Sequence, residues 1–226
     1  MSKDYAEILR EIEADVEKYS PYPDKVKIVA VSKYVEPEVA LEAYKQGIKC
    51  FGENRAQLLL PKKDYFEKNV ITDVEWHFIG NLQTNKVRQI APFVTMIHSV
   101  NRLSLAREID VQAKKYRRVI PVLLEINIYG EESKEGYEID TLIGDIPALT
   151  NLENLNIIGL MTMAPITEKQ DILDKVFGGL RSLQDRLNAE YFGGRLTELS
   201  MGMTNDYKVA LTHGATIVRI GSKIFK

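Results

Sequence analysis

The sequence predicts a (β/α)8 TIM barrel with an extra amphipathic helix at its N-terminus. Short apolar segments rich in β-branched residues occur eight times along the chain, and helical patterns separate them. Parallel strands need a crossover connection, which is usually a helix. The chain has 226 residues, near the roughly 250 that such barrels take. We therefore expect residues 1–226 to form a single domain.

The elements can be placed in order. The N-terminal helix is expected over residues 2–19, where the apolar residues recur three and four positions apart and form one stripe. Each strand is a short apolar run bounded by charged or turn residues. The eight strands are expected at 27–33, 50–54, 75–80, 95–100, 119–127, 156–163, 196–202 and 216–221.

Helical patterns fill the gaps between these strands. The first has Pro37 at its start and Gly47 past its end, as helices often do. The connections 55–66, which contains Pro61, and 83–93, which is short, are the least regular. The clearest helices are expected at 37–47, 102–116, 139–150, 168–191 and 206–214.

The alternative architecture is an open doubly wound sheet. Such a sheet should carry a glycine-rich phosphate turn after its first strand. Residues 31–38, "VSKYVEPE", contain no glycine. The sequence therefore favours the closed barrel.

Composition and charge exclude several kinds of partner. The chain has 30 basic and 32 acidic residues, a net charge of −2, so neither nucleic acid nor a membrane surface is expected. The charged N-terminus is unlike a secretory signal, and no apolar run approaches the ~20 residues needed to span a bilayer. Cys50 is the single cysteine. We expect a cytoplasmic protein with a small-molecule partner, as a monomer or, alternatively, a dimer.

The polar residues at strand ends indicate where a site should lie. In these barrels the site is built at the C-terminal ends of the strands. Lys33 ends the first predicted strand, and a desolvated ammonium is costly unless it is paired, reaches water, or is kept for its amine chemistry. Other polar side chains end their strands at the same rim, namely Glu53, Asn54, Asn81, Ser99, Asn101, Asn127, Ser200 and Arg219.

The loops after the seventh and eighth strands suggest an anion site. Barrels of this type often hold a phosphate there on backbone N–H groups. The segments "SMGM", residues 200–203, and "IGSK", residues 220–223, supply small residues and hydroxyls that let the backbone approach an anion. An amine and a phosphate cradle are thus expected at one mouth.

Several motifs together resemble one known family. They are "VAVSKYV", "FGENRAQ", "WHFIGNLQTNK", "IHSVNR", "GLMTMAP", "SMGMTNDYKVAL" and "VRIGSKIF". This set is similar to the pyridoxal 5′-phosphate (PLP) homeostasis proteins, single-domain relatives of the barrel of bacterial alanine racemase. The similarity runs from the first strand to the C-terminus.

The resemblance implies that the cofactor is PLP and that Lys33 holds it as a Schiff base. It implies that Ser200, Gly221 and Ser222 hold the phosphate, that Arg219 faces the pyridine nitrogen and that Asn54 lies close by. The family often has serine and alanine where this chain has Thr204 and Lys223, and threonine at Ser222. The cofactor-binding set is then expected to be Lys33, Asn54, Ser200, Met201, Gly202, Arg219, Gly221 and Ser222.

Arg219 bears on whether the protein turns over a substrate. A guanidinium does not give up its proton, so it can only donate to the pyridine nitrogen, which stays unprotonated and makes the ring a weak electron sink. In alanine racemase the second base is a tyrosine from an additional domain. This chain ends at Lys226, five residues after the last predicted strand, so we expect no such domain, and Tyr34, Tyr129 or Tyr207 would have to replace that base.

We therefore interpret the protein as one that binds, stores or delivers PLP in vitamin B6 homeostasis, with PLP-dependent apo-enzymes as possible recipients. The alternative is a low-activity PLP-dependent amino-acid racemase. A class I aldolase, which also joins a barrel lysine to a sugar phosphate, is a third interpretation, but it would need no Arg219.

A few residues have less specific readings. His77 is expected to lie beside the site, and Cys50 to be a small buried apolar side chain. The three scattered histidines and one cysteine show no metal-ligand spacing, so no metal is expected. Lys134 is a hypothetical second amine for the cofactor. Lys223 adds a positive charge beside the cradle, in an orientation that the sequence does not assign.

Overall fold

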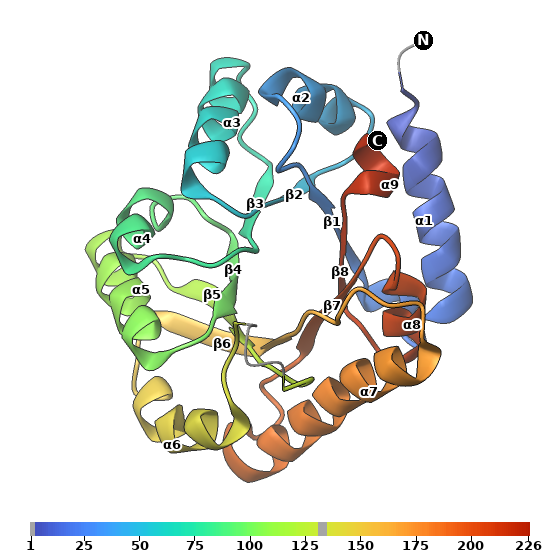
Figure 1. Ribbon diagram of the computed structural model, residues 1–226. Helices are drawn as coiled ribbons and strands as arrows, with labels where there is room; N and C mark the ends of the chain where they lie inside the picture. The colour runs from blue at the N-terminus through green and yellow to red at the C-terminus, as the bar shows by residue number, and fades with distance from the viewer. Residues whose placement is uncertain (1–2, 131–134) are drawn as a thin grey trace.

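The computed structural model, which describes residues 3–130 and 135–226, is a closed barrel of eight parallel strands. Each strand pairs with the next, and β8 closes the barrel on β1 (Figure 1). This confirms the predicted (β/α)8 fold. The strands are β1 (Lys27–Val31), β2 (Cys50–Glu53), β3 (Glu75–Phe78), β4 (Met96–Val100), β5 (Ile120–Glu125), β6 (Leu155–Met161), β7 (Glu198–Met203) and β8 (Ile217–Ile220).

Helices form a ring around the strands, and α1 lies outside that ring next to α8 and α9 (Figure 1). A short π-helical turn (Asn188–Phe192) follows α7. The helices in the described part of the chain are α1 (Tyr5–Tyr19), α2 (Pro37–Lys45), α3 (Ala56–Lys68), α4 (Thr84–Ile90), α5 (Leu103–Lys115), α6 (Ile139–Leu149), α7 (Gln170–Leu187), α8 (Tyr207–Thr212) and α9 (Ser222–Phe225).

The two irregular connections both form helices. Helix α3 continues through Pro61 although proline removes a helical hydrogen bond, because Leu59 and Phe66 are buried on its inner face. Helix α9 was not predicted; it follows β8 directly. Six of the eight strands, β1 and β2 among them, end one or two residues earlier than predicted, so Lys33 lies in the turn after β1 and Asn54 just beyond β2.

The stripe of α1 is buried on this chain's own barrel. Ile12 and Val16 are buried, and the ring of Tyr5 packs 5.9 Å from that of Phe225 in α9. In the part of the chain that the structure describes, no helix combines the length and apolarity needed to cross a membrane.

Side chains alternate between two cores along each strand. The outer core fills the space between strands and helices. The inner core lies inside the barrel and consists of Val29, Cys50, Met96, Leu123, Met161 and Ile217. Because the period is two, Arg219 faces the same interior as Ile217, and Glu125 the same interior as Leu123.

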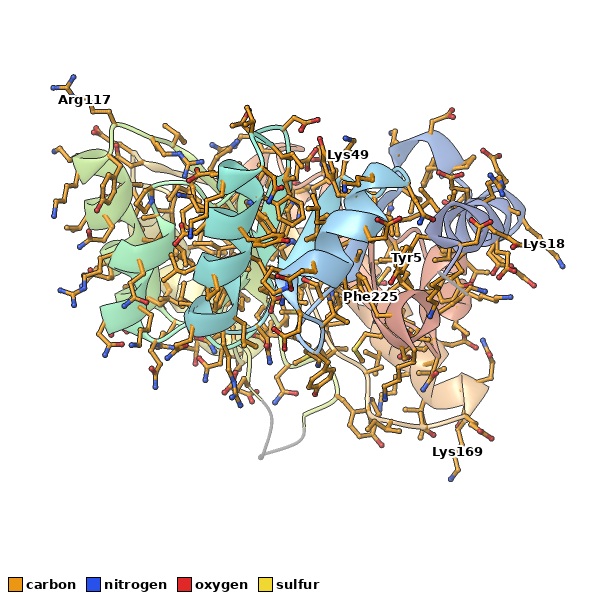
Figure 2. All side chains as sticks on the ribbon, turned by 90° about the horizontal axis from the view of Figure 1, so that it is seen from above. Tyr5, Lys18, Lys49, Arg117, Lys169 and Phe225 are labelled. Atoms are coloured by element: carbon orange, nitrogen blue, oxygen red, sulfur yellow. The ribbon has the colours of Figure 1, made fainter. Side chains whose placement is uncertain are left out.

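The barrel has two distinct ends. We call the end at the strand N-termini the floor and the end at the strand C-termini the mouth. Figure 2 shows Lys49 and Arg117, which precede β2 and β5, at one end, and Lys169, which follows β6, at the other. Helix α1 packs on the outside of the barrel and, with the strand starts, lines a cavity at the floor.

Candidate functional site

Lys33 presents an amine at the barrel mouth. It is half-buried in the turn after β1, and its Nζ lies 5.0 Å from the centroid of the Tyr34 ring. Tyr34 itself is 82% exposed. Among the residues that the structure describes, no carboxylate pairs with Lys33. The amine is therefore free to react with a group that enters the mouth.

A buried ion pair supports the chain just before Lys33. Lys62 of α3 donates to the Ser32 carbonyl oxygen at 2.8 Å and forms an ion pair with Glu53 of β2. The Ser32 hydroxyl donates to the same Glu53 carboxylate at 2.7 Å. All three side chains are buried. Two elements, α3 and β2, thus hold the end of β1 directly before Lys33.

Arg219 brings a guanidinium into the barrel interior. It is buried, and its NH1 and NH2 groups donate to the Ser200 hydroxyl at 2.6 Å and to the Thr162 carbonyl oxygen at 3.0 Å. Burial lowers the pKa of Arg219 to about 10, so the guanidinium stays a cation at neutral pH. These two bonds use two of its five N–H donors.

A chain of hydrogen bonds runs from Arg219 through the barrel interior to the floor. Ser200 Oγ lies 2.9 Å from His98 Nδ1, and His98 Nε2 lies 2.9 Å from His77 Nδ1. His77 Nε2 lies 3.4 Å from Glu75 Oε2. We call this series, from Arg219 to Glu75, the interior relay. It joins β8, β7, β4 and β3 across the barrel.

The two end groups of the interior relay determine which group donates each hydrogen bond. Burial lowers the pKa of both histidines, so each is neutral with one N–H and one lone pair. At the floor, a hydrogen bond from His77 and the charge of Lys27 lower the pKa of Glu75 to about 2, so this carboxylate only accepts. Arg219 only donates. Each group between them must therefore donate toward Glu75.

Glu125 places a carboxyl group inside the barrel at the end of β5. It is buried, and its Oε2 has no hydrogen-bond partner among the described residues. Burial, together with the charge of Glu135, raises the pKa of Glu125 to about 7, while Arg219 opposes this shift. The sequence prediction missed this residue. The signal was present, because a carboxylate two positions after Leu123 interrupts an apolar strand.

The loops after β7 and β8 meet at the mouth. Gly202 has φ +91°, and a Cβ there would lie 2.8 Å from the Tyr207 backbone, so glycine is needed for α8 to pack. The Gly221 N–H donates to Thr204 Oγ1 at 3.2 Å, and Ser222 is exposed at the start of α9. Thr204 was noted in the sequence only as a departure from the family pattern. The fold places its hydroxyl beside the predicted cradle.

The structure shows the surroundings of three residues at or beside the predicted phosphate site. Ser200 is buried inside the interior relay, because its position on β7 points into the barrel below the rim. Met201 points the opposite way into the outer core, so its backbone alone can face the mouth. Lys223 points to α1, where its Nζ lies 3.1 Å from Glu11.

The three tyrosines considered as a second base differ in burial and in position. Tyr207 is buried and its hydroxyl donates to Asp15 of α1, on the outside of the barrel, so it is not available at the mouth. Tyr34 and Tyr129 are exposed. Lys134, the hypothetical second amine, lies outside the described residues.

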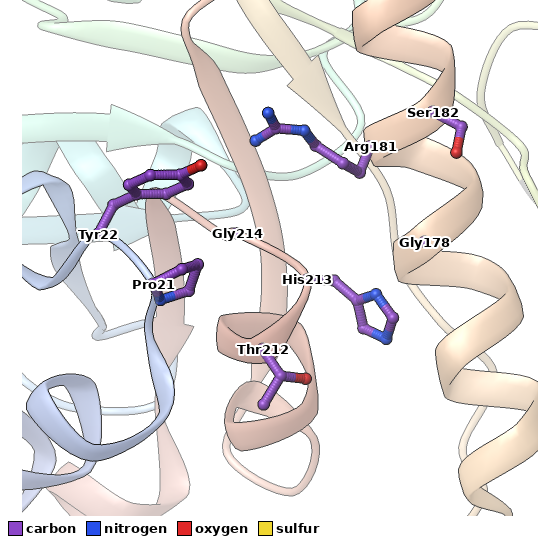
Figure 3. A pocket seen from close by; sticks show the side chains of 8 residues that line it. All are labelled: Pro21, Tyr22, Gly178, Arg181, Ser182, Thr212, His213 and Gly214. Carbon is purple, nitrogen blue, oxygen red and sulfur yellow. The ribbon is translucent and has the colours of Figure 1, made fainter.

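The remaining histidine belongs to a separate surface groove. This groove, about 350 Å³, lies between α7, α8 and the segment after α1, with Tyr22 and Arg181 on opposite sides (Figure 3). His213 Nε2 lies 2.8 Å from Asp174 of α7. The pair links α8 to α7, and we assign it a structural role.

Fold and site together define a class of protein. It is a closed (β/α)8 barrel that brings a lysine amine and a buried guanidinium to the same mouth. Residues 9–226 match the family model described as "Alanine racemase, N-terminal domain". The chain belongs to the pyridoxal phosphate homeostasis proteins of this superfamily, as the motif resemblance implied.

Two relatives carry this assignment. The pyridoxal phosphate homeostasis protein of Aquifex aeolicus (strain VF5) is 42% identical over 218 residues, 96% of this chain and 94% of that protein. The protein of the same name from Synechocystis sp. (strain ATCC 27184 / PCC 6803 / Kazusa) is 38% identical over 203 residues, 90% of this chain and 92% of that protein.

Solved structures with the same fold support the family assignment. PipY of Synechococcus elongatus PCC7942, solved with PLP bound, has a TM-score of 0.89 and 32% identity, with 98% of this chain and 100% of that chain covered. An alanine racemase of Clostridium difficile 630 has a TM-score of 0.76 at 15% identity and covers 97% of this chain but 56% of that chain. At that identity the likeness concerns the fold alone.

Proposed function

We propose that this protein binds PLP at the barrel mouth, linked covalently through the Lys33 amine, and stores or delivers it for vitamin B6 homeostasis. The observation that carries the proposal is that the Lys33 amine, which has no carboxylate partner among the described residues, and the fixed guanidinium of Arg219 lie at one end of the barrel. The PLP-bound PipY structure and the names of the relatives support it.

The residues present fit this cofactor. PLP supplies an aldehyde that condenses with a lysine amine, a pyridine nitrogen and a phosphate. Buried oxygens without a partner among the described residues lie at strand ends on the inner face of the barrel, on Asn54 and Glu125. Unpaired buried acceptors are costly, so a bound polar ligand would relieve them. The phosphate would lie against Gly221, Ser222 and Thr204, with the Gly202 backbone beside them.

Arg219 argues for binding over turnover. Ser200 and Thr162 orient its guanidinium, which can only donate a hydrogen bond to the pyridine nitrogen. That nitrogen then stays unprotonated, which weakens the ring as an electron sink. The interior relay reinforces this, because Ser200 already donates its proton to His98 and accepts from Arg219. We infer that the barrel holds the cofactor without substantial chemistry on amino acids.

A low-activity racemase is the second candidate. Racemisation needs bases on both faces of the α-carbon, and Lys33 could be one of them. Tyr34 is the residue that favours this candidate, because it adjoins Lys33 at the mouth. Its 82% exposure opposes the idea, since a base works best when it is held in place.

Delivery to PLP-dependent apo-enzymes in the cytoplasm completes the proposal. The mouth carries exposed apolar side chains, Tyr34, Met163 and Ile166, on the loops after β1 and β6. An open rim of this kind would let a recipient approach the cofactor. We also retain the predictions of one domain over residues 1–226 and of a monomer.

Absorption spectroscopy with borohydride reduction tests the cofactor link. The purified protein mixed with PLP should be yellow, and reduction followed by peptide mapping should place the label on Lys33. Lys33→Ala should lose the covalent label, whereas Lys169→Ala, which removes an exposed lysine near the same end, should keep it. Equal labelling of Lys33→Ala and the unaltered protein would refute the assignment.

Proton exchange separates binding from turnover. The PLP-loaded protein is incubated with D- or L-alanine in deuterated water, and the α-proton signal is followed by NMR. No exchange above free PLP is expected. Exchange that Tyr34→Phe abolishes would establish the racemase instead.

A further inference from the structure

Three potential metal ligands meet inside the barrel at its floor. Cys50 and Glu75 start neighbouring strands and are paired in register, and His77 lies two residues after Glu75 on the same face. The Cys50 Sγ, a carboxylate oxygen of Glu75 and a ring nitrogen of His77 all lie within 4.8 Å of one another. We call these residues the floor cluster.

A cavity leads to the floor cluster. It has a volume of about 520 Å³ and lies between α1 and the starts of β1, β2 and β3. Cys50 and Glu75 line it, together with the acidic side chains Glu13 and Glu17 of α1. The cavity can therefore admit a hydrated cation.

The Cys50 thiol lies at the floor end of the inner core, next to two polar side chains. It is 7% exposed, and no hydrogen bond to it is present among the described residues. Its neighbours on β3 are a carboxylate and an imidazole. A buried cysteine alone would be an ordinary apolar core residue, so the inference depends on the closeness of the three ligand atoms.

We propose that the floor cluster binds a thiophilic divalent cation of the Zn²⁺ class. Cys50 Sγ, His77 Nε2 and a Glu75 oxygen would be the protein ligands, and a water from the cavity would fill the fourth position. Bonds of about 2.0 to 2.3 Å in a tetrahedron separate the ligand atoms by about 3.5 Å. His77 Nε2 already lies 3.4 Å from Glu75 Oε2.

His77 is oriented as a metal-bound histidine should be. Such a histidine usually donates its other ring N–H to a nearby acceptor, which sets its tautomer. His98 Nε2 lies 2.9 Å from His77 Nδ1 and can accept that proton. Metal binding at Nε2 would place the His77 proton on Nδ1 and reverse this hydrogen bond. The proton of neutral His98 would then lie on Nδ1 and be donated to Ser200 Oγ, 2.9 Å away. On binding, the Cys50 S–H bond breaks, the sulfur bonds the metal and the proton leaves to solvent.

Lys27 competes for the same carboxylate. Its ammonium forms an ion pair with Glu75, and its side chain is 41% exposed and lines the cavity. It can therefore swing aside into the cavity when a dication arrives. Replacing Lys27 with an uncharged residue should tighten metal binding, which is an unusual effect for a substitution beside a site.

Cobalt spectroscopy and Zn²⁺ titration test the proposal on the tag-free, full-length protein. Because the chain has one cysteine, a thiolate-to-cobalt charge-transfer band reports Cys50 directly. We expect the band with Co²⁺ and its loss in Cys50→Ser. Zn²⁺ affinity in that variant should be at least about 100-fold lower, because even residues that only hydrogen-bond to metal ligands change affinity by about 10- to 100-fold. Lys27→Met should strengthen both signals.

Two results would overturn the site. One is the absence of a charge-transfer band in the unaltered protein. The other is equal Zn²⁺ affinity in the unaltered protein and Cys50→Ser, with thermal melting showing that the variant is folded. An unchanged affinity in Lys27→Met would exclude Glu75 as a ligand. None of these measurements depends on PLP, so the test is separate from that of the proposed function.

Discussion

Two lysine–glutamate ion pairs occupy opposite ends of the same barrel, and they differ mainly in burial. Lys62 and Glu53 near the mouth have side chains that are 3% and 0% exposed, whereas Lys27 and Glu75 at the floor are 41% and 39% exposed. The mouth pair supports the backbone before Lys33. The floor pair faces a water-accessible cavity. A lysine–glutamate ion pair thus holds the backbone in place at the mouth, whereas at the floor the same kind of pair can open to solvent.

Two glutamates extend this contrast. Burial raises the pKa of Glu125 near the mouth to about 7, whereas a hydrogen bond from His77 and the charge of Lys27 lower the pKa of Glu75 at the floor to about 2. Both face the barrel interior. The floor therefore holds a lasting negative charge, while the mouth contains a carboxyl group that changes charge near neutral pH.

The largest expected effect comes from breaking the mouth pair. Lys62→Met leaves the Glu53 carboxylate buried without a cation, which should cost about 4 kcal/mol of unfolding free energy. Urea denaturation measures it. The double variant Lys62→Met/Glu53→Gln should recover most of the loss, because no charge then remains buried. A loss of unfolding free energy below about 1 kcal/mol, which is typical of exposed pairs, would contradict the proposed difference between the mouth pair and the floor pair.

The second prediction concerns pH. Between pH 4.5 and about 7 the folded protein keeps a proton on Glu125 that the unfolded chain has released, so this residue's stability contribution falls as pH rises. Glu125→Gln removes the titration. The variant should gain on the order of 3 kcal/mol relative to the unaltered protein between about pH 5 and about pH 8. Urea denaturation of both proteins at several pH values measures this gain. An equal change of unfolding free energy with pH in Glu125→Gln and in the unaltered protein would contradict the prediction.

The third prediction tests how α1 is attached to the barrel. Tyr207→Phe removes the hydroxyl that donates to Asp15 of α1. A hydrogen bond to a charged group contributes about 1.5 kcal/mol, and thermal melting should show a corresponding loss. Tyr65→Phe is the control, since its hydroxyl has no hydrogen-bond partner in the described segments. Similar losses in both variants would mean that the Asp15 contact contributes little.

The smallest effect should follow from breaking the floor pair. Lys27→Met should change the unfolding free energy by less than about 1 kcal/mol, because both partners are screened by solvent. Urea denaturation beside Lys62→Met makes the comparison direct. A cost equal to that of Lys62→Met would show that burial does not control the strength of these pairs.

Much of the fold and part of the candidate site followed from local pattern. The alternation of strands and helices predicted the barrel, and strand-end logic brought Lys33, Arg219 and Gly221 to one mouth. Helix α9 was missed because four residues carry too little periodicity. The phosphate role of Ser200 stays a prediction, and the contacts of its hydroxyl with His98 and Arg219 depend on its depth in the barrel, which the sequence did not indicate.

The contacts across the barrel were beyond reach of the sequence. His98 and Ser200 are 102 residues apart, and Lys62 reaches Ser32 from a helix whose sequence gives no sign of an inward lysine. The floor cluster is a further case. Its cysteine and histidine show no metal-ligand spacing along the chain, and the register of β2 on β3 alone brings them together.

The sequence by itself determined the order of the eight strands, the helices between them and the chemistry gathered at the mouth. These depend on periods of 2 and 3.6 residues, which are local properties of the chain. The tertiary structure decided the interior relay, the buried Lys62–Glu53 pair and the floor cluster. Those depend on how eight strands register and close, which sets distances between residues far apart in the chain.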